Sequence, residues 1–360
     1  MARHIAVVGA GALGSFVGGH AARAGHDVTL IDAWPAHIDA IRERGLRLQD
    51  PAGESLVRLP ALHISEVQSL HRKPVDFTFV CVKVYDTDWA VSLIAPYLAA
   101  GGFVVTMQNA LVEERVARIV GWGRTLGAIA STINVMLAAP GHVVRTSGAG
   151  GQAYTVFRVG EVHGLETGRA HEVARVLALT DSARVTSNLW GERWSKLVQN
   201  SMTAGLSAVA GMTFREIYEN AVARRLIIRL AAEAIEVGRV LGYALEKVRG
   251  EEPDLYLCAA RGDSAAMQTL EAGMLRSQQQ RPENGRSGVA QDLAKGRRTE
   301  IDFMNGFVAE RGREAQVATP AHLALVQAVH AISRGECAPG MDALLALSSA
   351  VDARLEPAAK

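Results

Sequence analysis

The chain has 360 residues, of which 49% are hydrophobic and 21% charged, and its formal net charge is +1 at pH 7. This length suffices for two domains with separate cores. The balanced charge argues against a basic surface for nucleic acid or an anionic membrane, and no apolar run reaches membrane-spanning length. The cysteines Cys81, Cys258 and Cys337 are too widely spaced for a disulfide scaffold or a cysteine metal site. We expect a cytoplasmic protein without a bound metal.

A glycine-rich turn follows the first predicted strand. Residues 5–8 are an apolar run typical of a strand buried on both faces, and residues 15–24 favour a helix. The intervening glycines suit a dinucleotide, because they allow a tight turn, close approach of a pyrophosphate and packing of helix on strand. A second strand ends at Asp32, near the spacing at which a carboxylate binds the adenosine ribose. The alternative is an ordinary strand–turn–helix corner. The expected cofactor-binding residues are Gly9, Gly11, Ala12, Leu13, Gly14 and Asp32.

Strands and helices alternate through the first half of the chain. The expected strands cover 27–31, 75–83, 103–107, 125–135, 143–146 and 154–159, with a hairpin over 46–59. Helices are expected over 38–44, 91–98 and 112–120. This alternation predicts an α/β domain with a Rossmann-type, doubly wound parallel sheet.

The pattern becomes helical near residue 187. Helices are expected over 190–210, 214–241, 263–279, 289–311 and 320–334. We therefore predict a dinucleotide-binding domain over 1–187, an all-helical substrate and catalytic domain over 188–345, and a tail over 346–360.

Two predicted strands of the first domain end in polar residues. Lys83 follows one strand and Asn109 follows the next. Open parallel sheets bind ligands at the carboxyl ends of their strands, so both side chains are candidates for a ligand site. The alternative is that loops are polar in any case.

The predicted helix over 190–210 carries an unusual polar stripe. Lys196, Asn200, Thr203 and Ser207 fall on one face, with a single charge among neutral hydrogen-bonding groups. Such a stripe suits a cleft wall that binds a small polar ligand. A subunit interface, or a helix packed under a loop, would explain it equally well.

On the predicted helix over 289–311, Glu300 falls on the apolar face. A buried carboxylate needs a partner, for which Lys196 and Arg297 are candidates, although a structural pair with Arg297 or Arg298 is the alternative. Just upstream, Ser287 fits a helix N-cap better than a ligand contact.

Five stretches together resemble the ketopantoate reductase (2-dehydropantoate 2-reductase) family over nearly the whole chain. They are GAGALG, CVK, QN, WSKLVQN and SGVAQDLAKGRRTEIDFMNGF. The resemblance implies nicotinamide-dependent reduction of a 2-keto acid, ketopantoate to pantoate in pantothenate biosynthesis, in a cleft between the domains. It implies that Lys196 protonates the carbonyl oxygen and that Glu300 positions lysine and substrate. The implied substrate residues are Asn109, Asn200, Asn284 and Ser287, and Lys83 and Asn109 are implied beside the cofactor.

Three features depart from the family pattern. The family usually uses NADPH and carries a basic residue after the second strand, whereas Asp32 predicts a preference for NADH. Ala204 replaces an asparagine and Ala110 replaces the glycine of QNG, and residues 242–286 form a longer stretch than usual. Two alternatives remain: an NAD-dependent 2-hydroxyacid dehydrogenase of this fold acting on other branched or aromatic 2-keto acids, and a cofactor-sensing binding protein. The family also suggests a homodimer.

Overall fold

The computed structural model describes residues 3–278 and 285–355. The chain divides into two compact units, residues 1–189 and 190–360. The domain boundary expected at residue 187 lies two residues before the observed division after residue 189.

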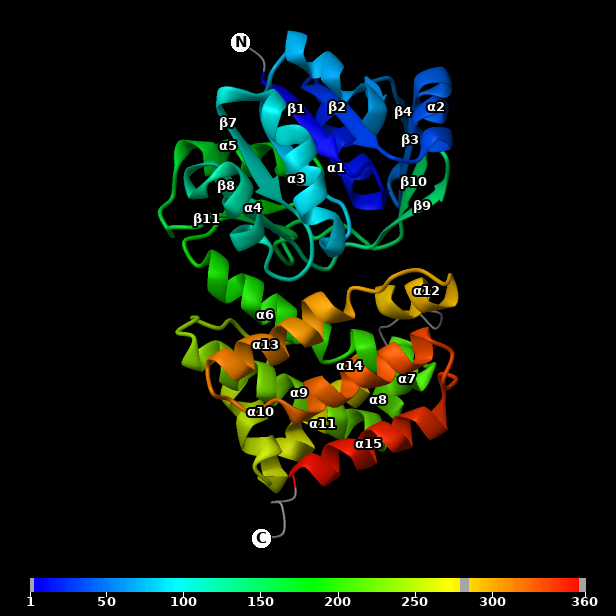
Figure 1. Ribbon diagram of the computed structural model, residues 1–360, viewed down its shortest axis with the longest axis vertical. Helices are drawn as coiled ribbons and strands as arrows, with labels where there is room; N and C mark the ends of the chain where they lie inside the picture. The colour runs from blue at the N-terminus through cyan, green and yellow to red at the C-terminus, as the bar shows by residue number, and fades with distance from the viewer. Residues whose placement is uncertain (1–2, 279–284, 356–360) are drawn as a thin grey trace. The chain divides into compact units, whose positions relative to one another are not determined.

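The first unit is built on a sheet with the strand order β12-β11-β8-β7-β6-β1-β2-β5 in the described residues (Figure 1). The strands are β1 (His4–Val8), β2 (Asp27–Asp32), β5 (Ala61–His63), β6 (Val75–Val80), β7 (Leu98–Thr106), β8 (Thr125–Ala130), β11 (Phe157–Glu161) and β12 (Ala183–Val185). All neighbours pair in parallel except β8 and β11. From β1, the strands β2 and β5 extend the sheet toward one edge, whereas β6, β7 and β8 extend it toward the opposite edge. This reversal creates the switch point where open α/β sheets bind ligands, and it confirms the predicted doubly wound sheet.

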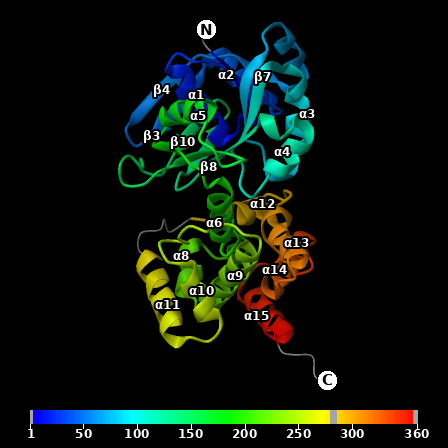
Figure 2. The same cartoon turned by 90° about the vertical axis from the view of Figure 1, so that its left-hand side faces the viewer.

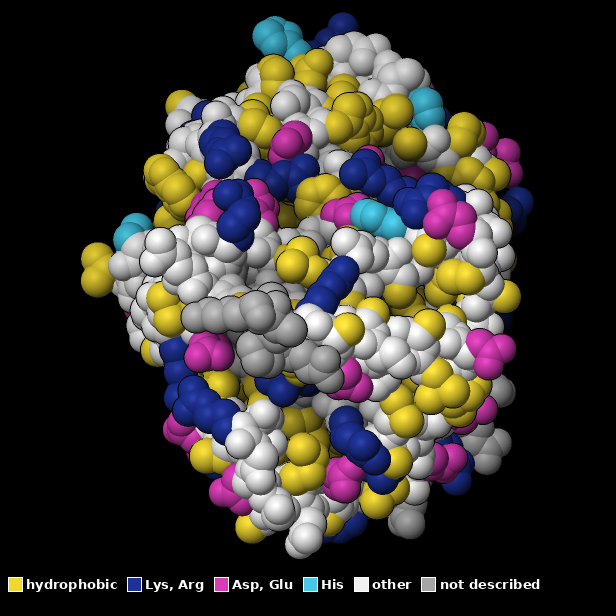
Figure 3. Space-filling view, turned by 60° about the horizontal axis from the view of Figure 1, so that its bottom comes forward, with side chains coloured by type: hydrophobic (Ala, Val, Ile, Leu, Met, Phe, Trp, Pro, Cys, Tyr) yellow, Lys and Arg dark blue, Asp and Glu magenta, His cyan; other side chains and the backbone are white. Residues whose placement is uncertain are grey.

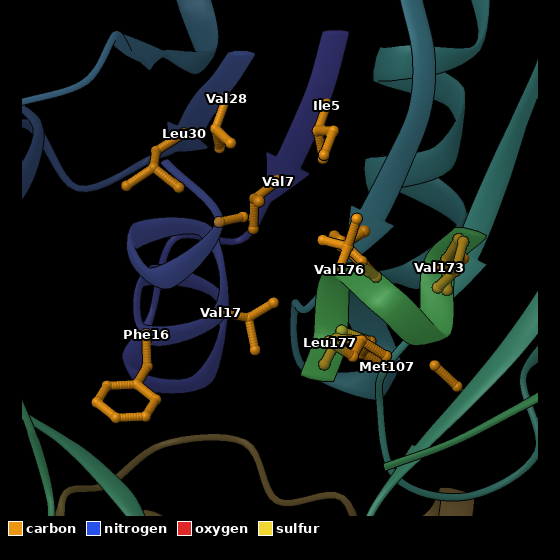
Figure 4. Close-up of a cluster of buried hydrophobic side chains, with 14 of the residues drawn as sticks. Ile5, Val7, Phe16, Val17, Val28, Leu30, Met107, Val173, Val176 and Leu177 are labelled. Carbon is orange, nitrogen blue, oxygen red and sulfur yellow. The ribbon is translucent and has the colours of Figure 1, made fainter. Parts of the chain in front are cut away.

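Helices cover both faces of this sheet. Figure 2 shows α1 (Ala12–Arg23) and α5 (Gly168–Ala178) on one side, and α3 (Thr87–Ile94) and α4 (Glu113–Val120) on the other. Because strand side chains alternate, Ile5 and Val7 join the core under α1 and α5, whereas Ala6 and Val8 join the core under α3 and α4. Figure 4 shows Val7 near Val17 of α1, within the first of these cores. A strand buried on both faces explains the continuous apolar run at residues 5–8.

A smaller sheet lies in the same unit, with the order β4-β3-β10-β9. Its strands are β3 (Leu46–Asp50), β4 (Gly53–Val57), β9 (Val135–Ala139) and β10 (His142–Arg145). The antiparallel pairing of β3 with β4 confirms the expected hairpin. The single strand expected over 125–135 is wrong, because β8 ends at Ala130 and β9 begins a different sheet at Val135. The first unit also contains α2 (Pro35–Arg44).

The second unit is helical, as predicted. Its helices are α6 (Leu189–Ser201), α7 (Ala204–Ala210), α8 (Phe214–Glu219), α9 (Ala221–Val240), α10 (Pro253–Ala260), α11 (Ser264–Gln278), α12 (Gly288–Ala294), α13 (Phe307–Glu314), α14 (Pro320–Ser333) and α15 (Met341–Leu355). A π-helical turn, η5 (Asp302–Gly306), leads directly into α13. Trp194 of α6 is fully buried, and its Nε1 donates to the carbonyl of Ala234 in α9 at 2.8 Å. Within the described residues, every helix is too short or too polar to cross a membrane.

Several expected helices are interrupted. The helix expected over 190–210 is divided into α6 and α7, and the one over 214–241 into α8 and α9, where Asn220 caps α9 by accepting from the Ala223 N–H at 3.0 Å. The continuous helix expected over 289–311 is also wrong, since α12 ends at Ala294. Residues 346–355, expected to belong to a tail, form most of α15, where Leu347 and Val351 are buried.

Candidate functional site

The glycine turn lies at the switch point of the sheet, between β1 and α1. The backbone N–H groups of Gly9 and Ala10 both donate to the carbonyl of Ile31 in β2, at 2.9 and 3.1 Å. Helix α1 then begins at Ala12, and Gly11 at its N-cap has no side chain to accept from the first turn. The N–H groups at this end, on residues such as Ala12 and Leu13, therefore meet no capping side chain, as an anion site at a helix N-terminus requires.

Glycine is suited to each of the three positions for a different structural reason. Gly9 has φ +91°, and a Cβ there would lie 2.7 Å from the backbone nitrogen of Val82. A Cβ on Gly14 would lie 2.2 Å from the Gly9 carbonyl oxygen, so only glycine lets α1 pack this closely on β1. A Cβ on Gly11 would have no heavy atom within 4 Å. The space beside Gly11 is open, which fits the close approach of a pyrophosphate to the backbone.

A buried polar network behind the turn was not predicted from the sequence. The Ser15 hydroxyl donates to the Ala10 carbonyl at 2.6 Å and lies 3.1 Å from Nε2 of His37. On the other side of the ring, Nδ1 of His37 accepts from the Gly141 N–H at 2.9 Å. Burial lowers the pKa of His37, although the nearby Asp32 opposes this effect. A neutral His37 thus links the turn to the loop that joins β9 and β10.

Asp32 ends β2 beside the glycine turn. Because Val8 pairs with Ile31, Gly9, the first residue after β1, comes next to Asp32, the last residue of β2. The half-buried Asp32 carboxylate accepts from the Trp34 N–H at 2.9 Å through Oδ1. Ala33 and Trp34, which follow it, are exposed and uncharged. A carboxylate at this strand end is suitably placed to accept from ribose hydroxyls.

Lys83 and Asn109 follow β6 and β7 at the same edge of the sheet. Both are half-buried. Lys83 comes one residue after Val82, which packs against Gly9, and the neighbouring Cys81 N–H donates to the Val8 carbonyl at 2.8 Å. Next to Asn109, Ala110 has φ +62°, a conformation that favours glycine and costs an alanine about 1 kcal/mol. The glycine of the family's QNG sequence would adopt it without strain.

The polar stripe of the second unit is shorter than predicted. Lys196 and Asn200 share one face of α6 and are half-buried. Thr203 and Ser207 lie beyond the end of α6 and bond to backbone: Thr203 donates to the Gln199 carbonyl at 3.2 Å, and Ser207 donates to the Met212 carbonyl at 2.6 Å. The stripe thus retains Lys196 and Asn200 as candidate ligand residues.

Glu300 stands at the start of the helix formed by η5 and α13, not in the middle of a longer helix. Its carbonyl accepts from the N–H groups of Phe303 and Met304, and the residue is 9% exposed. The expectation that Glu300 falls on the apolar face of one helix over 289–311 is therefore wrong, because Gly296 has φ +63° and interrupts that helix.

The helix of Glu300 packs against α6 and α7. The Trp194 and Phe307 rings lie 6.1 Å apart, and the buried Asn305 donates from Nδ2 to the Ser201 carbonyl at 2.8 Å. A Cβ on Gly205 would lie 2.8 Å from Cδ1 of Ile301. Glu300 and Lys196 are thus carried by helices in direct contact.

Asn305 was not among the predicted site residues, although the NG pair in the family-like stretch contains it.

Ser287 is the N-cap of α12, as expected from its position. Its hydroxyl accepts from the Ala290 N–H at 3.1 Å and donates to the Ala204 carbonyl at 2.8 Å. The residue is 2% exposed. Asn284 lies outside the described residues.

The fold and these side chains define a class of proteins: a Rossmann-type unit with a glycine turn at its switch point, followed by a helical unit, as in nucleotide-dependent oxidoreductases. Residues 5–157 match the family described as ketopantoate reductase PanE/ApbA, and residues 188–333 match its C-terminal counterpart. The chain belongs to the ketopantoate reductase family, a family of pyridine-nucleotide-dependent reductases.

Relatives and solved structures resemble the chain over most of its length. The 2-dehydropantoate 2-reductases of Archaeoglobus fulgidus and Pyrococcus horikoshii are 27% and 29% identical to it, over 92% of this chain and 99% of each relative. The crystal structure of a ketopantoate reductase from Ralstonia eutropha JMP134 has a TM-score of 0.76 at 26% identity, covering 93% of this chain and 99% of that one. D-mandelate dehydrogenase with NADH and anilino(oxo)acetate shares the fold, with a TM-score of 0.74 at 23% identity over 92% of this chain and 99% of its own.

Proposed function

We propose that this protein reduces the carbonyl group of a 2-keto acid with a reduced nicotinamide cofactor, and that ketopantoate is its substrate. The observation that carries the proposal is the packing of the Glu300 helix against the helix that holds Lys196 and Asn200. The open turn at Gly11 supports a dinucleotide in the first unit. The names of the relatives, 2-dehydropantoate 2-reductase, support the substrate.

Within this proposal Lys196 is the general acid. When bound, the reduced nicotinamide would supply a hydride to the keto carbon, so that negative charge would develop on the carbonyl oxygen. The Lys196 ammonium would donate a proton to that oxygen, a contribution typically worth about 10²–10⁴-fold in rate. Glu300, which is almost buried, would hold the ammonium in place through its negative charge.

The remaining site residues would bind and orient the substrate. Asn109, Asn200 and Asn284 offer amide groups that donate to a carboxylate and accept from a hydroxyl. Ser287 already donates its proton to the Ala204 carbonyl. Its contribution would be to fix the start of α12 and to offer a remaining lone pair to the substrate hydroxyl. Lys83 would lie beside the cofactor, because it follows the strand next to the glycine turn.

We further propose that the cofactor is NADH. The Asp32 carboxylate would accept from ribose hydroxyls and repel the 2′-phosphate of NADPH, and the next two residues offer no positive charge. D-mandelate dehydrogenase of the same fold was solved with NADH, so this architecture accommodates that cofactor.

The test is a steady-state survey of 2-keto acids with both cofactors, on the native protein and on Asp32→Asn. Asparagine keeps an oxygen for the Trp34 N–H but removes the charge. We expect ketopantoate-dependent NADH oxidation by the native protein. In the variant, the ratio of kcat/KM for NADH to that for NADPH should fall at least tenfold, about 1.4 kcal/mol.

The exposed Asp88→Asn change serves as the control, since it should leave the ratio unchanged. Equal use of NADPH by the native protein would contradict the proposed cofactor preference. Turnover with other 2-keto acids but not ketopantoate would contradict the substrate. Failure of every 2-keto acid to oxidise either cofactor would overturn the proposed activity.

A further inference from the structure

A pocket of the helical unit lies outside the proposed reaction residues. It has a volume of about 440 Å³ and is bounded by the ends of α7, α12 and α14 and by the segment that leads to α15. Lys196, Asn200 and Glu300 are not among its described lining residues. This size is sufficient for a small metabolite.

Three arginines line this pocket. Arg286 precedes α12, and its Nη1 donates to the Gly211 carbonyl at 3.4 Å. Arg297 and Arg298 follow the left-handed turn at Gly296, and Cζ of Arg298 lies 5.6 Å from the centre of the Phe303 ring. All three arginines are exposed, and no acidic side chain is among the described lining residues. The described lining residues therefore bring three positive charges together on a protein whose net charge is only +1, and the Glu216 carboxylate interacts electrostatically with Arg286 from outside this lining.

The rest of the pocket wall is largely apolar. Ala208, Leu293 and Ile332 contribute to it, together with the thiol-bearing Cys337. Guanidinium groups bind phosphate and carboxylate oxygens through paired hydrogen bonds, and three of them match a doubly charged group better than a single carboxylate. An apolar wall favours a ligand with a small hydrocarbon portion over a free inorganic ion.

We propose that this pocket binds a small phosphate monoester. The phosphate lies among Arg286, Arg297 and Arg298, and the organic group rests against the apolar wall. This inference goes beyond the proposed reduction and does not depend on it.

Cys337 provides a local readout, because it is exposed and lines the pocket. Phenyl phosphate is the probe, and the rate of alkylation of Cys337 by uncharged iodoacetamide is measured by peptide mass spectrometry. We expect millimolar phenyl phosphate to slow this rate at least fivefold in a saturable way. Cys258, which is also exposed but does not line the pocket, should react at the same rate throughout.

Two comparisons test whether the arginines and the phosphate group are responsible for binding in the pocket. Arg297→Gln should weaken protection by phenyl phosphate at least tenfold, whereas Arg313→Gln, an exposed arginine on α13, should not change it. Benzyl alcohol should give no protection, and inorganic phosphate should give at least fivefold weaker protection. Absence of saturable protection, equal protection by inorganic phosphate, or an unchanged response of Arg297→Gln would overturn the proposal.

Discussion

The three glycines of the first turn show what residue spacing can and cannot predict. The spacing correctly placed the turn after β1, because each glycine sits where a strand–turn–helix corner needs it. The reasons differ: Gly9 has a positive φ, Gly14 touches the Gly9 carbonyl, and Gly11 faces open space. The sequence predicted a tight turn, close approach of a pyrophosphate and packing of helix on strand at the three glycines in this order, and the conformation of Gly9 and the close packing at Gly14 agree with it. The contact of Gly9 with Val82 could not be predicted, because Val82 follows β6 far along the chain.

Gly11→Ala separates cofactor binding from folding. The added methyl group projects into open space, so we expect the free energy of unfolding to change by less than about 0.5 kcal/mol. The methyl group would occupy the position that a pyrophosphate approaches, so the Kd for NADH should rise at least tenfold. Calorimetric titration and chemical unfolding measure the two effects.

The matched control is Gly168→Ala at the start of α5, where a Cβ also meets open space. This control should preserve both stability and cofactor affinity. If Gly11→Ala bound NADH as tightly as the native protein, the turn would not be the pyrophosphate site.

Apolar periodicity predicted the helices of the second unit, but it joined several helices that are separate in the structure. Helix α12 ends in a Schellman motif, in which the Arg297 N–H donates to the Asp292 carbonyl and the Gly296 N–H donates to the Leu293 carbonyl. The Lys295-Gly296 pair is the ordinary stop signal for such an end and could have revealed it. By contrast, no local signal predicts that Asn305 bonds the last residue of α6, because 104 positions separate them.

Asn305→Ala tests this link between helices. The fully buried Asn305 amide donates to the Ser201 carbonyl and lies 3.1 Å from Nδ1 of His322. Removing it leaves buried acceptors without this donor, so the free energy of unfolding should fall by at least about 2 kcal/mol. Urea unfolding followed by circular dichroism measures the loss. Gln268→Ala on the exposed face of α11 should change stability by less than about 0.5 kcal/mol, and a similar value for Asn305→Ala would contradict the proposed link.

For the whole molecule, the sequence predicted a doubly wound sheet and a helical unit because alternation and periodicity are local patterns. The smaller sheet was harder to predict, since Arg47 of β3 pairs with His142 of β10 far along the chain. Figure 3 shows basic and acidic side chains interspersed on the face in view. This distribution agrees with the near-zero net charge.

A buried ion pair makes the stability of the first unit sensitive to acid. Burial alone would raise the pKa of Asp181, but the N–H groups of Gly150, Ser182 and Gly151 and the Arg145 guanidinium, 2.5 Å away, together lower it from 3.8 to about 2. The folded state therefore favours the carboxylate. The resulting stability is present above the unfolded pKa and is lost as the pH falls toward 2.

Asp181→Asn should therefore destabilise the protein by about 2–3 kcal/mol at neutral pH and flatten the dependence of stability on pH between about 4 and 2. Urea unfolding across this range measures both effects. Asp88→Asn, which alters an exposed carboxylate paired with Arg115, should keep the native dependence. If the free energy of unfolding of Asp181→Asn depended on pH as it does in the native protein, this carboxylate would not control acid stability.

The central claim is that Lys196 donates the proton in the reduction of a 2-keto acid. The most direct measurement is the kcat of Lys196→Met for ketopantoate with NADH, together with the Kd for NADH and with Lys247→Met as a surface control. We expect kcat to fall at least about 100-fold while NADH affinity stays within about twofold, and the control to retain native values. Native turnover by Lys196→Met would contradict the account.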